Sequence, residues 1–244
     1  MKKNRMMRVA SALLVAVLLS TCAISGTFAK YVTTASGTDS ARVAKWGVKI
    51  SGIADTLFAK TYAKDADTTI VNTIEANEKV VAPGTKNETG VTFSLTGTPE
   101  VAVQIDIAVK GSDSDTITDV VLPAGNGYTD WTQAPYKGTF DLEADYHPVV
   151  FTLKDGETTL ATGTLAEIET FLESKSGSYA PGKDLSTILG GTSGTYTLTW
   201  AWAFGGNDKA DTLLGNLVTE TQIAIDNAFT KIDFAIEITA TQID

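Results

Sequence analysis

The chain has 244 residues, of which 29 are acidic and 19 basic, for a formal net charge of −10. This charge disfavours nucleic acid and anionic membrane surfaces as partners, because both are themselves negatively charged. A single histidine and a single cysteine exclude a disulfide within the chain and a zinc site built from several such ligands.

The first 29 residues have the pattern of an export signal. Basic residues precede an uncharged apolar run over residues 9–19, which is too short for the ~20 residues that cross a bilayer as a helix. Small side chains at Thr27 and Ala29 suit a signal peptidase that cuts before Lys30. We therefore predict a cleaved signal peptide over residues 1–29 and a secreted or cell-surface mature chain.

Two other fates of this leader stay open. The uncharged run could remain uncut as a membrane anchor. Alternatively, Cys22 could be lipidated, since residues 19–22 loosely match a lipidation box. Cleavage removes Cys22 and four of the 19 basic residues but no acidic residue, so the mature chain has a net charge of 15 minus 29, or −14. With no cysteine left, the fold depends on core packing, for which about 215 residues suffice.

Residues 30–41 are small and polar, without apolar periodicity, and are expected to be flexible or weakly extended when alone. After them, alternating apolar and polar residues predict strands. The clearest is the run over residues 101–109, with five apolar residues in strict alternation. The other expected strands are residues 43–50, two short strands within residues 54–80 on either side of the polar run 64–69, residues 91–95 after a turn at Pro83-Gly84, and a hairpin of residues 149–153 and 158–162 around Asp155-Gly156.

Two loops of the middle region carry side chains that could bind a ligand. The loop over residues 111–119 holds Asp113, Asp115 and Asp119, but it lacks the glycine and the terminal glutamate of a known calcium loop. We expect a solvated acidic loop, and calcium binding stays open. The connection over residues 123–138 is rich in Gly, Pro, Asn and Thr and predicts a long surface loop.

That second loop contains three aromatic residues, Tyr128, Trp131 and Tyr136. They either pack the loop on its own domain or form a platform for a sugar ring, and both interpretations stay open.

One helix is predicted near residues 164–175. Thr164 and Glu167 have the spacing of a capping box, and Gly177 is expected to end the helix. The apolar residues on its inner face are Leu165, Ile168, Phe171 and Leu172.

The last third of the chain holds the expected centre of the core. Residues 196–204 alternate, with aromatic side chains on one face. Residues 205–215 predict a turn-rich connection, residues 223–229 a short helix or bridging strand, and residues 232–238 the final strand. The whole pattern predicts a mostly β, antiparallel sandwich with one short helical insertion, formed as a single domain by residues 42–244.

Several motifs resemble those of the TasA and camelysin family, which are exported proteins of Gram-positive bacteria. The motifs are Gly-Thr-Phe-Ala-Lys-Tyr at residues 26–31, Ser-Ala-Arg-Val-Ala-Lys-Trp at residues 40–46, Pro83-Gly84 before an alternating strand, Thr-Trp-Ala-Trp-Ala-Phe at residues 199–204, Asn207-Asp208, Asp-Thr-Leu-Leu-Gly-Asn at residues 211–216, and Ala-Thr-Gln at residues 240–242. Residues 111–190 match the family only in character.

The resemblance implies a jelly-roll sandwich, cleavage by a SipW-type signal peptidase, and a structural subunit of biofilm matrix fibres. In such fibres the freed N-terminal segment of one subunit completes the sheet of the next, so the partner is a second copy or a related matrix subunit. The donor-strand residues implied here are Tyr31, Val32, Thr33, Thr34, Ala35 and Ser36. At about 3.3 Å per residue, residues 31–40 extend ~33 Å, the length of a full strand. The membrane is involved only through the uncleaved signal.

Other functions also remain. Residues 30–40 could be an unstructured leader of a monomeric module that binds a wall glycan or a protein through the aromatic loop. Camelysin-like members of the family have been classed as metalloproteases, but a zinc protease needs about three ligands and a general base. The chain offers only His147, without a His-Glu-x-x-His motif. We therefore expect no catalytic residue, no metal and no cofactor.

Overall fold

The computed structural model describes residues 42–52, 57–62, 71–72, 79–111, 115–129, 139–219 and 230–243. The chain divides into two compact units, residues 1–43 and 44–244, and the second contains all the elements described below. The predicted signal peptide and residues 30–41 lie outside the described residues.

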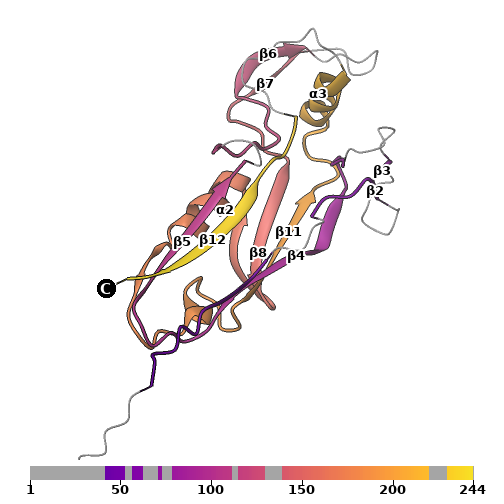
Figure 1. Ribbon diagram of the computed structural model, residues 1–244. Helices are drawn as coiled ribbons and strands as arrows, with labels where there is room; N and C mark the ends of the chain where they lie inside the picture. Colours follow the sequence, from indigo (N-terminus) through magenta and orange to yellow (C-terminus); the bar gives the residue numbers. More distant parts are fainter. Residues whose placement is uncertain are drawn as a thin grey trace, which may run out of the picture. The chain divides into compact units, whose positions relative to one another are not determined.

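The larger sheet of the second unit has five antiparallel strands among the described residues, in the order β1-β4-β11-β8-β9. They are β1 (Lys49–Ser51), β4 (Lys86–Thr96), β11 (Thr195–Trp202), β8 (Val149–Asp155) and β9 (Thr158–Gly163). β11 lies between β4 and β8, as Figure 1 shows. The strand with the most aromatic inner face therefore occupies the middle of the sheet, where both of its edges are paired.

The smaller sheet has three strands in the described part of the chain, in the order β10-β5-β12. They are β10 (Gly177–Tyr179), β5 (Val103–Lys110) and β12 (Ala235–Gln242). β12 pairs antiparallel with β5 over its full length, from Ala235 opposite Lys110 to Gln242 opposite Val103. Two ribbons complete the described strands: β2 (Thr61–Tyr62) with β3 (Val71–Asn72), and β6 (Gly125–Thr129) with β7 (Thr139–Leu142).

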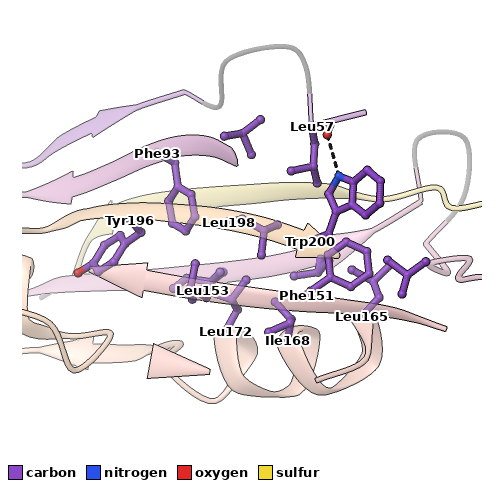
Figure 2. Packing of buried hydrophobic residues seen from close by; sticks show 14 of the residues in the cluster. Leu57, Phe93, Phe151, Leu153, Leu165, Ile168, Leu172, Tyr196, Leu198 and Trp200 are labelled. Carbon is purple, nitrogen blue, oxygen red and sulfur yellow. Dashed lines mark hydrogen bonds between the residues drawn. The ribbon is translucent and has the colours of Figure 1, made fainter. Parts of the chain in front are cut away.

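Residues of both sheets contribute to one hydrophobic core. At its centre, Tyr196, Leu198 and Trp200 of β11 are almost fully buried. The Trp200 indole donates a hydrogen bond of 2.8 Å to the carbonyl of Leu57, so the one polar atom of this large side chain is satisfied. Figure 2 shows this bond, with Phe151 close to the Trp200 ring.

Helix α2 (Leu165–Glu173) confirms the predicted insertion. The Thr164 side chain accepts from the Glu167 backbone N–H, and the Glu167 carboxylate accepts from the Thr164 N–H at 2.8 Å. Leu165, Ile168 and Leu172 are buried in the core. The helix ends at Glu173 with Ser174 as its C-cap, close to the predicted end, and the chain then turns into β10, which begins at Gly177 and pairs with β5.

A second helix, α3 (Asp208–Thr219), replaces much of the turn-rich connection predicted for residues 205–215. Gly205 and Gly206 have positive φ angles and form the expected turn, but the helix begins directly after it. Two acidic residues, Asp208 and Asp211, lie in its first turn, where the helix dipole favours negative charge. Its inner face is formed by the buried residues Ala210, Leu213 and Leu214.

Three strand predictions also need correction. β1 begins at Lys49 rather than at residue 43. Residues 125–129, predicted as surface loop, form β6, because their backbone pairs with β7. β11 ends at Trp202, and Phe204, predicted to lie on its buried face, is 78% exposed.

The turn of the β8–β9 hairpin lies one residue later than predicted. Asp155 pairs with Thr158, so the two turn residues are Gly156 and Glu157. Gly156 takes the first position of this turn with a φ of +57°, which glycine adopts at little steric penalty.

Candidate functional site at the edge of strand β12

Several predicted site residues lie outside the described residues. They are the cleavage-site residues Thr27, Ala29 and Lys30, the donor-strand residues Tyr31, Val32, Thr33, Thr34, Ala35 and Ser36, and the aromatics Trp131 and Tyr136. These stay predictions. The structure instead describes surfaces with which a donor strand or a ligand would have to pair.

Tyr128, the one described member of the aromatic trio, packs within its own hairpin. Its ring lies 5.5 Å from the ring of Phe140 on β7, and its hydroxyl donates a hydrogen bond of 2.6 Å to the carbonyl of Pro123. Burial, and secondarily the charge of Asp145, raises the pKa of the Tyr128 hydroxyl. The side chain therefore already has partners within the hairpin.

Asp119 and His147 come together beside the start of α2. The Asp119 carboxylate accepts from the backbone N–H of Val120 at 2.8 Å and of Leu165 at 3.4 Å, and it lies 3.6 Å from His147 Nδ1. Burial raises the pKa of Asp119, although the two N–H groups and His147 oppose the shift. Within the described ranges, no group of three His, Cys, Asp or Glu side chains could hold a metal ion. The loops that carry Asp119 and His147 are thus in contact with each other and, through Asp119, with the first residue of α2.

Strand β12 has one edge that is unpaired within the described part of the chain. One of its sides pairs with β5, and no described strand pairs with the other. The Ile243 N–H donates to the Ala102 carbonyl, on the β5 side. Successive N–H groups of a strand point to opposite sides. The backbone N–H groups at positions 236, 238, 240 and 242 therefore point away from β5, toward the open side.

The inner face of β12 is only partly covered. Ile236, Ile238 and Ala240 are half-buried, whereas their partners on β5, which are Val109, Ile107 and Ile105, are buried. Apolar surface is thus left at the open side of the strand, next to the outward backbone groups. A strand added there would gain main-chain hydrogen bonds and bury the flanks of the two isoleucines.

The edge also lacks the usual protections against pairing. Natural edges are blunted by proline, bulges, inward charges or shortness. β12 has eight residues, no proline and no register shift against β5. Its only charged residue, Glu237, is exposed and forms an ion pair with Lys110 on β5. The hydrogen bond and charge of Glu237 raise the pKa of Lys110.

The other described edges are shorter or interrupted. β1 and β10 have three residues each, and β9 has a register shift against β8 and packs against α2. β1 covers only the last three residues of β4. Earlier on β4, the Asn87 side chain accepts from the Gly90 N–H and donates to the Leu57 carbonyl, both at 2.8 Å, and these bonds interrupt the rest of that edge. Among the described residues, β12 therefore has the longest uninterrupted edge.

Comparison of the chain with protein families, with curated proteins and with solved structures finds no match. No helix in the described ranges is long and apolar enough to span a membrane. The β12 edge was not found by sequence reasoning. Alternation over residues 232–238 predicted the strand, but alternation does not tell an edge strand from a central one.

Proposed function

We propose that this protein is a secreted subunit of an extracellular matrix fibre, in which the freed N-terminal segment of one copy pairs with the β12 edge of the next. The observation that carries the proposal is the eight-residue unpaired edge with half-buried isoleucines behind it. Strand addition of this kind uses main-chain hydrogen bonds for affinity and side-chain pockets for specificity.

The lengths of donor and acceptor agree. At about 3.4 Å per residue, the eight residues of β12 span ~27 Å. Residues 30–41 reach about 40 Å when extended, so they cover the edge and leave a short connection to the next domain. Signal cleavage before Lys30 would release this segment from the membrane and so control assembly.

The resemblance to the TasA and camelysin family supports the same function and a jelly-roll arrangement of the two sheets. A SipW-type signal peptidase would then be the processing partner, and a second copy or a related subunit the assembly partner. We do not propose a protease activity. The carboxylate next to His147 is that of Asp119, which already accepts from two backbone N–H groups, and a zinc protease needs about three metal ligands.

The first test compares a chain that starts at Lys30 with a chain that starts at Arg42. Electron microscopy and size-exclusion chromatography should show filaments or oligomers for the first protein and monomers for the second. Monomers in both samples at high concentration would contradict assembly through the N-terminal segment.

The second test blocks the acceptor edge by Ala240→Pro in the chain that starts at Lys30. Proline lacks an N–H, and the N–H at position 240 points to the open side, so the β5 pairing is retained. We expect a folded monomer that no longer assembles. The matched control is Thr241→Pro, which removes an N–H directed at β5 and should lower thermal stability. Filaments of normal length from the Ala240→Pro protein would exclude β12 as the acceptor.

A further inference from the structure

The strand register defines two opposite ends of the five-stranded sheet. At one end Lys49 pairs with Thr96, and Trp46 precedes this pair; we call it the Trp46 end. At the other end Trp202 pairs with Val149, and Phe204 follows; we call it the Phe204 end. Each end carries a large apolar side chain in contact with solvent: Trp46 is 40% exposed and Phe204 is 78% exposed.

The backbone on both sides of Trp46 is held in place. The Lys45 N–H donates to the Glu100 carboxylate at 2.8 Å, and the Glu100 N–H donates to the Lys45 carbonyl at 2.9 Å. Gly47, with a φ of +66°, lies so close to Thr98 that a Cβ would be 2.8 Å from its carbonyl oxygen. The partly exposed indole is thus presented by an ordered backbone, which lowers the entropy lost on binding.

The Phe204 end contains a hollow of about 290 Å³. Phe140 and Leu142 of β7 line one side, and residues 206–210, at the start of α3, line the other. Phe204 lies two residues before this segment. The hollow therefore has two large apolar side chains among polar lining residues, and the exposed Phe204 is close by in the chain.

The two ends differ in their local charge. Lys45 and Lys49 flank Trp46, and Glu100 accepts from the Lys45 N–H. Lys183 and Asp184 lie nearby, because the N–H groups of Gly182 and Leu185 donate to the carbonyls of Pro99 and Gly97. The charged residues that line the hollow are Asp141, Asp208 and Lys209, and Glu143 and Asp145 follow shortly after the end of β7. The chain next to Trp46 thus carries two lysines in a protein of net charge −10, and it lies opposite an acidic end of the sheet. Such complementarity favours contact between unlike ends and disfavours contact between like ends.

We propose that the Trp46 end of one copy docks on the Phe204 end of the next, with the Trp46 indole covering the hollow and the exposed Phe204 side chain in the same contact. The two surfaces lie at opposite ends of one sheet, so the contact is head-to-tail and leaves a free end at each side of a pair. Contacts of this kind repeat into a filament unless the rotation closes a ring. The inference rests on the proposed function for its place in a fibre and adds a second, side-chain-specific contact to it.

The docking also sets the direction of the donor segment. Residues 30–41 precede Trp46 closely, so in the docked copy they enter at the Phe204 end of their neighbour. β12 starts at that end, where Phe234 packs on Phe151, and finishes near Ala102, toward the Trp46 end. The donor would therefore run antiparallel to β12, like every described strand pair.

The test uses cross-linking between two single-cysteine forms of the exported protein. One carries Lys45→Cys and the other Lys209→Cys, both with Cys22→Ser, so that the introduced cysteine is the only one whether or not the signal is removed. A short bismaleimide added to the mixture should join unlike proteins. Cross-links only between identical proteins, or none in samples that contain filaments, would overturn the inference and leave donor-strand assembly standing.

Side-chain variants provide the second measurement. Trp46→Ala and Phe204→Ala should each lower the yield of the unlike cross-link by at least about tenfold, as expected for an aromatic residue at the centre of an interface. Thr162→Ala is the control, because Thr162 is exposed and pairs with Thr152 at the middle of β8, away from both ends, and it should leave the yield unchanged. Equal yields from all three variants would refute a role for the two aromatics. Unlike cross-links in a protein without filaments would instead contradict the proposed fibre and retain the end contact.

Discussion

Replacing Asp155 by alanine is expected to lower the free energy of unfolding by about 2–6 kcal/mol. Asp155 is 7% exposed at the end of β8. Its carboxylate accepts from the backbone N–H groups of Thr192 and Ser193 and from the Ser193 hydroxyl. Alanine leaves the two N–H groups without this acceptor, and each unsatisfied N–H costs about 1–3 kcal/mol of stability. The hydroxyl contributes less, because it also bonds to the Thr195 carbonyl.

Thermal and urea unfolding followed by circular dichroism measure this loss. A loss of about 4 kcal/mol corresponds to a fall in Tm of about 8–16 °C for a domain of this size. Asp155→Asn keeps one acceptor oxygen and should fall between alanine and the wild type. Glu157→Ala, in the exposed turn of the same hairpin, is the control and should change stability by less than about 0.5 kcal/mol. An Asp155→Ala protein as stable as that control would refute the reasoning.

The same carboxylate gives a pH dependence with a defined sign. Burial raises the pKa of Asp155, but the hydrogen bonds from Ser193 and Thr192 outweigh it, so the pKa lies below the ordinary value of 3.8. Its contribution is therefore fully present above that value and is lost as the pH falls below it. The stability difference between wild type and Asp155→Asn should stay constant above about pH 5 and shrink as the pH falls through 3.8 and then through the lowered pKa. Asp119 and Asp211, whose pKa values are raised mainly by burial, cancel in this difference.

Three further substitutions test single contacts. Gly90→Ala should destabilise the protein strongly, because Gly90 has a φ of +65° and a Cβ there would lie 2.3 Å from a backbone oxygen of β11. Gly127 has a similar φ of +71° but open space around it, so Gly127→Ala is the control and should lower the free energy of urea unfolding only by the conformational cost of about 1–2 kcal/mol. Thr164→Ala removes the cap of α2 and should lower the free energy of unfolding by about 1 kcal/mol. A loss of the helical circular dichroism signal of the whole helix would contradict a cap that acts only on the first turn. Tyr146→Phe removes the 2.7 Å hydrogen bond to the buried Asp211 carboxylate and should lower the urea midpoint by an amount equivalent to about 1.5–3 kcal/mol, whereas an unchanged midpoint would show that this bond does not stabilise α3.

Prediction from the sequence worked where one face of an element meets the core. The alternation in β5, β8 and β11 and the capping box of α2 are local patterns, and the structure shows the corresponding strands and helix. It failed where a local signal had two meanings. The Gly-Gly-Asn-Asp run was interpreted as a continuing turn, although the buried residues Ala210, Leu213 and Leu214 have the i, i+3, i+4 spacing of a helix.

The candidate site divides in the same way. Alternation predicted β12, but the open side depends on which strands lie beside it, and β5 is more than a hundred residues away in the chain. The partly covered face of Ile236 and Ile238 follows from that arrangement, because an edge strand has a neighbour on one side only.

The sequence by itself determined the acidic character, the export-signal pattern, the β-rich fold class and the approximate places of the longer strands, because charge and periodicity are properties of short stretches. Only the tertiary structure decided that β11 is central, that β12 is an edge, and that Trp46 and Phe204 lie at opposite ends of one sheet. The physical reason is that strand order and exposure arise from hydrogen bonds between segments far apart in the chain. No local pattern encodes which of two similar strands will find a partner on both sides.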